Sequence, residues 1–257
     1  DDEFDLGISN DGGADGIRKR VLDNSADRTG DLRDGITRII ATDYDNTDVN
    51  IYVNNGATTN TVLSAGTLDV SGTFVLGQDL DDFTTPAFDG TRELQGQIGD
   101  VIYFSRIITD TERQQVSSLL AIKYGITLDQ TTDQDYLNSV SEAIYPVSSE
   151  TANYAAFDND IAGIGRDDGS RLSQLRSKSI NSDAIITGSH TEGFDVDRQF
   201  VVWGNNNGGT TFNTTEISTG ITNRIQREWR VAVSNSPDPI DMSFDLSGTT
   251  STPAASA

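Results

Sequence analysis

The sequence predicts a mainly β protein: an antiparallel β-sandwich, one amphipathic helix and then a second β-rich domain. Short runs of β-branched and aromatic residues recur along the 257-residue chain, separated by Gly, Asn, Asp and Ser. The 24 glycines suit the tight turns that join short strands. Only residues 109–128 combine a helical start signal, an apolar stripe and a stop signal. These three observations favour short strands with a single helix between them.

Strands before the helix are predicted from five apolar runs, at residues 35–41, 49–53, 61–63, 68–76 and 98–104. Asn54, Asn55 and Gly56 lie between the second and third runs. Asn-Gly tolerates the positive φ values of a type I′ turn, so these residues predict a hairpin. The last run, IGDVIYF, is predicted to form a buried strand.

The helix is predicted from signals at both of its ends. Thr109 and Glu112 fit a capping box, in which the Thr hydroxyl and the Glu carboxylate satisfy free backbone N–H groups. Gly125 is placed to end the helix in the left-handed conformation. Val116, Leu119, Leu120 and Tyr124 form the predicted apolar stripe. We expect this stripe to pack on a sheet and the helix to join two β-rich halves.

The second half of the chain begins with a predicted polar linker and a short helical turn before residue 140. Further strands are expected at residues 161–168, 172–181, 184–187, 200–204, 225–233 and 240–246. The run at 225–233 alternates and places Trp229, Val231 and Val233 on one face. Arg227 falls on this same face, so it either lies near a sheet edge or pairs with a buried carboxylate.

Two stretches resemble known families. The segment 88–128 reads FDGTRELQGQIGDVIYFSR, then TDTERQQVSSLLAIKYGITL after two isoleucines. It resembles the C-terminal part of a laminin-G-like (concanavalin-A-type) domain of bacterial surface proteins. The strings IAGIGRDD, SKS, FVVWGNNN and REWRV resemble a β-domain that follows this unit in large bacterial surface adhesins.

The resemblance implies a domain order. A partial laminin-G-like jelly roll is expected at residues 1–108, the joining helix at 109–128, the second β-rich domain at 129–248 and a linker or tail at 249–257. Laminin-G-like domains usually have more strands before the Asn-Gly turn. We therefore expect a neighbouring segment or a partner chain to complete the sandwich and cover its edges.

Charge excludes some partners. The chain has 40 acidic and 18 basic residues, a net charge of −22. Such a surface repels nucleic acid and anionic membranes, so nucleic-acid binding is excluded. Membrane insertion is not expected, because no apolar run reaches the length of a bilayer span. There is no cysteine and hence no disulfide or thiol chemistry.

Calcium is the predicted metal, because Ca²⁺ takes six to eight oxygen ligands of the kind that acidic loops supply. Three loops are candidates, and the alternative for each is a solvated acidic turn. The predicted ligands are Asp43, Asp45 and Asp48 in the first loop, Asp79, Asp81, Asp82 and Asp89 in the second, and Asp158, Asp160, Asp167 and Asp168 around the IAGIG run.

Catalysis is not expected. His190, the only histidine, lies in a polar loop and is predicted to be a surface residue, with no nucleophile-elbow pattern beside it. No predicted strand carries the alternating Glu and Asp residues of a concanavalin-like glycosidase. Trp203 and Trp229 are predicted to be core residues. The exposed candidates for ligand binding are Tyr44, Tyr52, Asn205, Asn206 and Asn207.

The sequence therefore favours a non-enzymatic extracellular module of a bacterial adhesin or surface protein. The module would bind or present a carbohydrate or peptide ligand, with calcium as a stabilising ion. The alternative is a structural spacer or self-assembling module, whose partners are neighbouring domains of the same surface protein. A third hypothesis, a glycan-processing enzyme, needs two carboxylates facing each other across a cleft.

Overall fold

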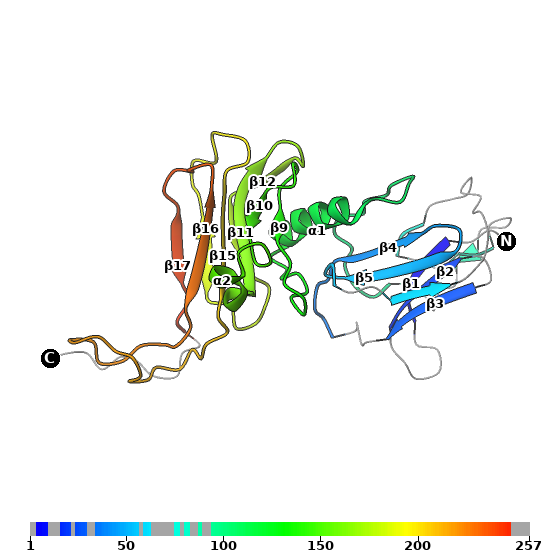
Figure 1. Ribbon diagram of the computed structural model, residues 1–257. Coiled ribbons are helices and arrows are strands. Elements are labelled where there is room, and N and C mark those ends of the chain that lie inside the picture. The colour runs from blue at the N-terminus through cyan, green and yellow to red at the C-terminus, as the bar shows by residue number, and fades with distance from the viewer. Residues whose placement is uncertain are drawn as a thin grey trace. The chain divides into compact units, whose positions relative to one another are not determined.

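The computed structural model describes residues 4–9, 16–21, 24–29, 34–56, 59–62, 75–77, 80–82, 87–88 and 94–247 (Figure 1). The predicted mainly β fold class is confirmed, because these residues form antiparallel sheets with only two α-helices among them. The chain folds into two compact units. Unit 1 comprises Asp1–Asp34, Thr42–Ile51 and Thr59–Ile108, and unit 2 comprises Gly35–Ala41, Tyr52–Thr58 and Thr109–Ala257.

Unit 1 begins with a three-stranded antiparallel sheet that the sequence did not predict. Its strands are β1 (Phe4–Ser9), β2 (Gly16–Val21) and β3 (Asn24–Thr29). Sequences such as GIRKRV and NSADRT contain few apolar residues, so hydrophobic alternation does not mark them as strands. A short pair, β7 (Leu80–Asp82) and β8 (Ala87–Phe88), follows later in the chain.

The predicted hairpin around Asn54 is confirmed. Strand β5 (Asp48–Val53) lies between β4 (Ile40–Tyr44) and β6 (Thr59–Val62), and it pairs with β6 in antiparallel register. Asn54 and Asn55 have φ values of 48° and 59°, as a type I′ turn requires. The Gly56 N–H donates to the Val53 carbonyl at 2.8 Å and closes the turn.

The predicted buried strand at residues 98–104 is wrong. No described strand includes this segment, and its five large apolar side chains are between 41% and 66% exposed. These side chains are Ile98, Val101, Ile102, Tyr103 and Phe104. High β-propensity reflects packing against neighbours, and none of the described strands pairs with this segment. The predicted strand at 68–76 lies mostly outside the described residues.

Helix α1 (Asp110–Tyr124) has the predicted caps. The Glu112 N–H donates to Thr109 Oγ1 at 3.2 Å, and the Thr109 N–H donates to Glu112 Oε2 at 2.8 Å. Gly125 follows in the left-handed conformation with φ 68°. The buried face is made of Ser117, Ser118, Ala121 and Ile122, and the predicted stripe is only half-buried. These mostly small residues let the helix approach the sheet closely.

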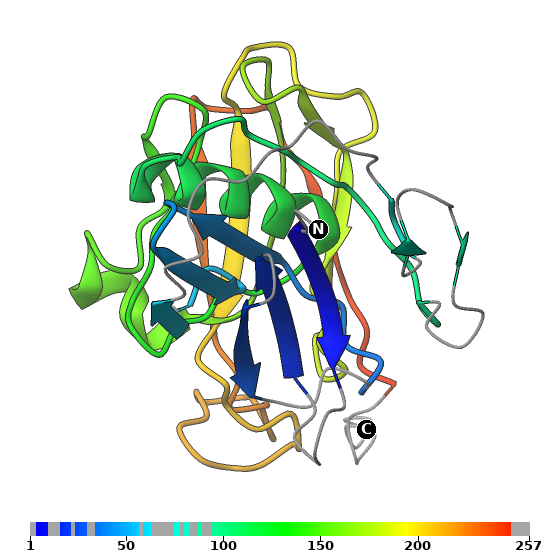
Figure 2. The ribbon, with the colours of Figure 1, turned by 90° about the vertical axis from the view of Figure 1, so that its right-hand side faces the viewer.

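Helix α1 packs on a four-stranded antiparallel sheet in unit 2 (Figure 2). The strands, in spatial order, are β12 (Leu172–Gln174), β11 (Asn159–Asp167), β15 (Phe200–Asn205) and β16 (Trp229–Ser234). A Cβ atom on Gly163 of β11 would lie 3.0 Å from Ile122 Cδ1 of the helix, so glycine permits the close approach. The short pair β9 (Tyr136–Leu137) and β10 (Ala143–Tyr145) covers the same face, where a helical turn was predicted.

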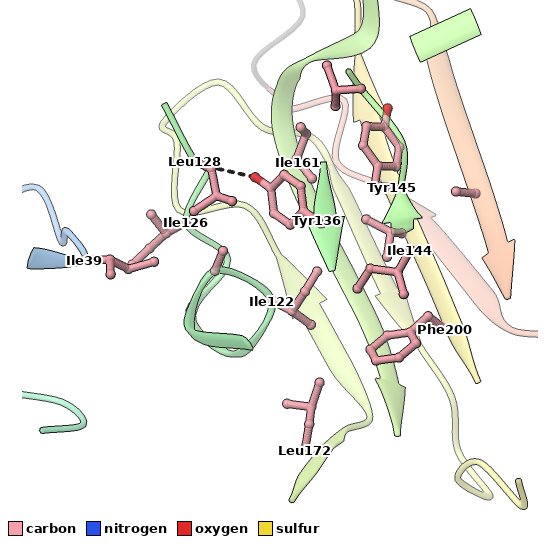
Figure 3. Packing of buried hydrophobic residues seen from close by; sticks show 14 residues of the cluster. Ile39, Ile122, Ile126, Leu128, Tyr136, Ile144, Tyr145, Ile161, Leu172 and Phe200 are labelled. Carbon is pink, nitrogen blue, oxygen red and sulfur yellow. Dashed lines mark hydrogen bonds between the residues drawn. The ribbon is translucent and has the colours of Figure 1, made fainter. Parts of the chain in front are cut away.

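A first core fills the space between this face and α1 (Figure 3). Alternate residues of the central strands, such as Ile161 and Phe200, point into it. The Leu128 N–H donates to the hydroxyl of the fully buried Tyr136 at 2.8 Å, so the buried hydroxyl has a hydrogen-bond partner within this core. Ile39, which precedes β4, also packs here.

The opposite face of the sheet packs on a second sheet. That sheet consists of β13 (Arg176–Lys178), β14 (Ile186–Ser189) and β17 (Asp241–Phe244). Ala162, Ile164 and Trp203 pack against residues of β14 in a second core. Trp203 and Trp229 both contribute to this core, as the sequence predicted. Two short helical turns, α2 (Thr151–Tyr154) and Ala155–Phe157, precede β11.

Candidate functional site

A hollow of about 340 Å³ in unit 2 is the candidate site. It is defined here as the amide hollow and is lined by Tyr52, Asn55, Gly56, Asp110, Arg113, Gln114, Thr132, Asp133, Gln134 and Ser148. The Asn54–Gly56 turn, the first turn of α1 and the 129–135 loop supply most of this lining. The Asp129 N–H donates to the Asn54 carbonyl at 2.8 Å, which fastens the turn to the loop. A Cβ atom on Gly56 would overlap the Asp129 side chain, so the glycine lets this side chain lie close to the turn.

Arg113 lines the amide hollow and contacts three of its other residues. Its guanidinium carbon is 3.9 Å from the centre of the Tyr52 ring, a cation–π contact. Its Nε donates to Asn55 Oδ1 at 3.1 Å, and its Nη1 pairs with Asp110 Oδ1 at 2.7 Å. These contacts fix the guanidinium in one orientation. They also cover Tyr52, which is buried, and this differs from the exposed ring that the sequence predicted.

Hydrogen bonds of side-chain amides fix the rest of the lining of the hollow. Asn55 Nδ2 donates to Gln134 Oε1 at 2.6 Å, and Gln134 Nε2 donates to the Asp129 carbonyl at 2.5 Å. Gln114 Nε2 donates to the Asp135 carbonyl at 2.7 Å. The carboxylates of Asp110 and Asp133 are exposed beside them. The arrangement can therefore offer both donors and acceptors to a polar ligand in a preorganised geometry.

The predicted ligand Asp160 is part of a buried ion pair. Its carboxylate accepts from Asn181 Nδ2 at 2.8 Å and Asn205 Nδ2 at 2.6 Å, and Arg227 Nη1 lies 3.3 Å away. Arg227 therefore pairs with a buried carboxylate, the second of the two predicted possibilities. A cation at Asp160 would have to displace this arginine, so the residues present do not fit calcium. Asp158 is only half-buried, and burial raises the pKa of its carboxyl.

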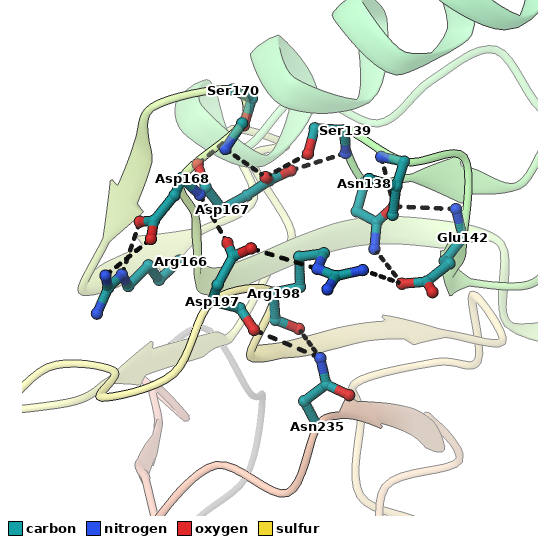
Figure 4. A network of polar contacts seen from close by, with 12 residues as sticks. Asn138, Ser139, Glu142, Arg166, Asp167, Asp168, Ser170, Asp197, Arg198 and Asn235 are labelled. Carbon is teal, nitrogen blue, oxygen red and sulfur yellow. Dashed lines mark hydrogen bonds and ion pairs between the residues drawn. The ribbon is translucent and has the colours of Figure 1, made fainter.

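The predicted ligands Asp167 and Asp168 belong to a network at the end of β11 (Figure 4). The Asp167 carboxylate is buried and accepts from the Ser139 N–H at 2.8 Å, the Ser139 hydroxyl at 2.5 Å and the Gly169 N–H at 3.1 Å. Both Asp168 oxygens accept from Arg166 at 2.8 Å, and this hydrogen-bonded pair lowers the pKa of Asp168. These oxygens are already satisfied by the protein, so they do not fit a metal site either.

Arg198 extends the same network (Figure 4). Its Nη1 lies 3.4 Å from Glu142 Oε2, and its Nε lies 3.3 Å from Asp197 Oδ2 without the geometry of a hydrogen bond. Asn235 Nδ2 donates to the Arg198 carbonyl at 3.2 Å. Sequence reasoning did not find this network, because its members come from four separate segments.

The Asp43–Asp48 loop is a turn held by its own carboxylates. Asp45 Oδ1 accepts from the Thr47 and Asp48 N–H groups at 2.9 and 2.6 Å, and these bonds lower the pKa of Asp45. Asp43 Oδ1 accepts from Asn50 Nδ2 at 2.7 Å. Asp48 Oδ1 is buried and has no partner among the described residues. The neighbouring Tyr44 is half-buried on β4.

The remaining predicted ligands belong to the second acidic loop. Asp79 and Asp89 lie outside the described residues. Asp81 and Asp82 belong to β7, and their side chains are outside the description. Over the part of the chain that is described, no three histidine, aspartate or glutamate side chains gather as metal ligands do.

The predicted ligand-binding asparagines mostly hold their own loop. Asn205 is buried, donates to Asp160 and accepts from the Asn207 N–H at 2.8 Å. Asn206 Oδ1 accepts from the Gly208 N–H at 3.0 Å and the Glu228 N–H at 2.9 Å. Only Asn207 is exposed, with a positive φ of 53°. None of the three lines the amide hollow.

The prediction that His190 is a surface residue is wrong. The residue is 8% exposed, and its ring packs edge-to-face on Phe194 with the ring centres 4.9 Å apart. It directly follows β14, and its N–H donates to the Leu175 carbonyl at 2.8 Å. Local polarity predicted exposure, whereas the packing of Phe194 against the second core buries the imidazole.

Comparison with known proteins identifies a family but no activity. A family described as a domain of unknown function, DUF8202, matches residues 112–256. No curated protein and no solved structure matches the chain. The resemblance to a laminin-G-like domain therefore stays a prediction. Because the matched residues make up more than half of the 257-residue chain, the protein belongs to the DUF8202 family of unknown function.

Proposed function

We propose that this protein is a non-enzymatic module of a bacterial adhesin or similar extracellular surface protein, and that it binds a carbohydrate in the amide hollow. The observation that supports this proposal is the lining of the hollow. Two glutamines, an asparagine, an arginine and two exposed carboxylates face a volume of about 340 Å³. Ligand sites of this size bind small molecules or a few units of a larger one.

Carbohydrate is favoured over a peptide by the chemistry of these groups. A sugar presents neighbouring hydroxyls, each of which both donates and accepts, and planar amides and carboxylates match such pairs. Tyr52 lies beneath Arg113, so the hollow offers little free aromatic or aliphatic surface for a peptide side chain. We expect hydrogen bonding at the edges of the sugar, rather than stacking on a ring, to provide the affinity.

A non-enzymatic role is supported by the state of the titratable groups. Asp160 and Asp167 are buried acids whose oxygens bond to neighbouring side chains and backbone. His190 Nε2 has no hydrogen-bond partner among the described residues, although Ser189 is its neighbour in the chain. A Ser–His–acid relay needs the histidine to be bonded on both sides.

Saturation-transfer NMR on the full chain tests this proposal, with neutral, acidic and amino monosaccharides and disaccharides as probes. We expect at least one sugar to bind saturably to the natural protein. Asp133→Asn and Gln114→Ala should weaken that sugar by roughly three- to tenfold, as expected for one lost hydrogen bond. Glu216→Gln, an exposed acid outside the hollow, is the matched control and should leave binding unchanged. Binding that is equal in all four proteins would contradict the assignment to the amide hollow.

The second candidate is a structural module that spaces or presents a neighbouring domain of the surface protein, or assembles with copies of itself. It is favoured by the dense polar networks around Asp160 and Asp167, which stiffen unit 2 without creating a site. Failure of every sugar to bind would favour this candidate. Conversion of a sugar, seen as new anomeric NMR signals, would instead favour a glycan-processing enzyme.

A further inference from the structure

Residues 98–107 of unit 1, called here the apolar segment, present a run of exposed apolar side chains. The large apolar side chains of the segment are between 41% and 66% exposed, and they are Ile98, Val101, Ile102, Tyr103, Phe104 and Ile107. No described strand pairs with the segment, although its β-branched and aromatic residues favour a strand. An exposed apolar patch of this extent is typical of an interaction site.

The apolar segment has apolar side chains on both of its faces. Residues 97–104 run without a turn or a bend, and a bend follows at residues 105–106. Side chains alternate along an extended chain, so Ile102 and Phe104 lie on one face and Val101 and Tyr103 on the other. A strand that is apolar on both faces is usually covered by other residues. Its exposure therefore indicates a missing neighbour but does not identify it.

The charges of the apolar segment identify the neighbour. Asp100 and Arg106 are its only charged residues, and both are exposed. Tyr103 lies midway between them, three residues from each. When two copies of the segment pair in antiparallel register about Tyr103, Asp100 of each copy lies directly opposite Arg106 of the other. The segment is thus complementary in charge to a second copy of itself, on a chain whose net charge of −22 otherwise repels its copies.

We propose that two copies of this protein associate through the apolar segment, as an antiparallel pair of strands with a twofold axis at Tyr103. In this register Ile102 of each copy lies opposite Phe104 of the other, and the two Tyr103 side chains are neighbours. Opposite charges, aromatic pairs and pairs of an aromatic with a β-branched residue are cross-strand neighbours that stabilise a sheet. The twofold symmetry makes the ion pair and the Ile102–Phe104 pair occur twice.

The association is expected to be weak and reversible. A pair of strands is only marginally stable by itself, and the bend at residues 105–106 has to straighten when the copies pair. Arg106 Nη1 donates to the Ile107 carbonyl at 3.2 Å, and a guanidinium with five N–H groups can hold this bond and a carboxylate together. The inference does not rest on carbohydrate binding, which saturation-transfer NMR tests separately. It gives the structural-module candidate a specific surface for self-assembly.

Sedimentation equilibrium of the full chain in physiological salt, over a wide range of concentrations, tests the proposal. We expect a concentration-dependent dimer of the natural protein. Asp100→Arg brings two arginines opposite each other at both symmetric contacts, and Arg106→Asp brings two aspartates there, so each change should weaken the dimer roughly tenfold. Overall repulsion predicts otherwise, because Asp100→Arg lowers the net negative charge. Glu192→Arg, at an exposed acid in unit 2, changes the net charge equally and should not weaken the dimer.

A mixture of the Asp100→Arg and Arg106→Asp variants tests the register directly. Each cross-strand contact of the mixed dimer joins an arginine to an aspartate, so the mixture should dimerise about as tightly as the natural protein. The double variant Asp100→Arg/Arg106→Asp should likewise dimerise with itself. The proposal is overturned if the natural protein stays monomeric at every concentration, a result that would favour cover by other residues of the same chain. It is also overturned if either single variant dimerises normally, or if the mixture stays monomeric.

Discussion

Arg227 and Asp160 form an ion pair in the interior of unit 2, with Arg227 Nη1 3.3 Å from Asp160 Oδ2. Their side chains are only 5% and 8% exposed. Arg227 also pairs with Asp183 Oδ2 at 2.8 Å and donates to the Gly208 carbonyl at 2.9 Å. One guanidinium thereby connects the start of β11 with two loops that are distant in the sequence.

Removing this arginine should be strongly destabilising. Arg227→Met leaves the buried Asp160 carboxylate without its cation, and such a change costs about 3–5 kcal/mol. Urea unfolding followed by circular dichroism measures the loss. Arg224→Met is the matched control, because Arg224 pairs with the exposed Glu216 and Glu228 and should cost less than about 1 kcal/mol. Equal losses in the two variants would contradict a stabilising role for the buried pair.

Asp167→Asn should destabilise the protein through the Ser139 contacts. Asp167 is 1% exposed, and both of its oxygens accept hydrogen bonds, whereas an asparagine has only one acceptor oxygen. One buried N–H or O–H group then loses its partner, at a cost of about 1–3 kcal/mol. Asp168→Asn serves as the control for a change at the exposed neighbour, and urea unfolding compares the two. A loss at Asp168 as large as that at Asp167 would be the contrary result.

Gly125→Ala should lower the free energy of unfolding more than the same change at other glycines with positive φ. Gly125 has φ 68°, and a Cβ atom there would overlap the Lys178 carbonyl oxygen, which is backbone and cannot move away cheaply. We expect a loss of about 2 kcal/mol or more. Gly220→Ala is the control, since Gly220 has φ 89° but nothing within 4 Å of the added atom. Its loss of about 1 kcal/mol measures the backbone strain alone. Thermal melts of both variants give the difference, and equal shifts would contradict the overlap.

Stability should fall in alkaline solution because of the buried tyrosines. Burial raises the pKa of the Tyr136 hydroxyl above its usual value of 10.0. Below pH 10 both the folded and the unfolded protein keep this proton, so it contributes nothing to the pH dependence. Above pH 10 the unfolded protein releases the proton while the folded protein retains it, so the free energy of unfolding falls as pH rises.

The variant Tyr136→Phe tests whether Tyr136 causes this fall in the free energy of unfolding with rising pH. The variant should lose about 1 kcal/mol at pH 7, because the Leu128 N–H loses its acceptor. Its stability should then decline less steeply than that of the natural protein between pH 10 and pH 11. Urea unfolding at several pH values provides the two slopes. Tyr103→Phe, at an exposed tyrosine, should leave the natural slope unchanged. Parallel slopes for Tyr136→Phe and the natural protein would show that Tyr136 is not the source of the alkaline loss of stability.

Calcium remains a testable prediction for the first half of the chain. The Asp43–Asp48 loop contains the one predicted ligand, Asp48, with a buried oxygen that lacks a partner among the described residues. Calcium at a hundred times its dissociation constant should stabilise the protein by about 2.7 kcal/mol relative to a chelator, seen in a thermal melt. The triple change Asp43→Asn/Asp45→Asn/Asp48→Asn should abolish the shift. A shift that survives it would place the ion elsewhere, and no shift in the natural protein would exclude calcium.

Features that depend on a few consecutive residues could be read from the sequence. The capping box of Thr109 and Glu112, the left-handed Gly125 and the turn at Asn54 and Asn55 are each formed within one turn of chain. Alternation likewise predicted a strand at residues 225–233, of which the structure forms the part that begins at Trp229. Such features follow from the sequence because the groups that interact are held close together by the backbone itself.

The candidate sites depended on tertiary structure. Arg227 and Asp160 are 67 residues apart, and the alternation at residues 225–233 left open whether Arg227 lies near a sheet edge or pairs with a buried carboxylate. For the same reason, the sequence did not predict the exposure of residues 98–104, the burial of His190 or the amide hollow. Strand pairing, burial and convergence of side chains depend on which distant segments meet, and that choice follows from packing the whole core rather than from any local pattern. The sequence by itself determined the β class, the helix and its turns, and only the tertiary structure decided which polar groups are buried, which are paired and which surround a ligand-sized space.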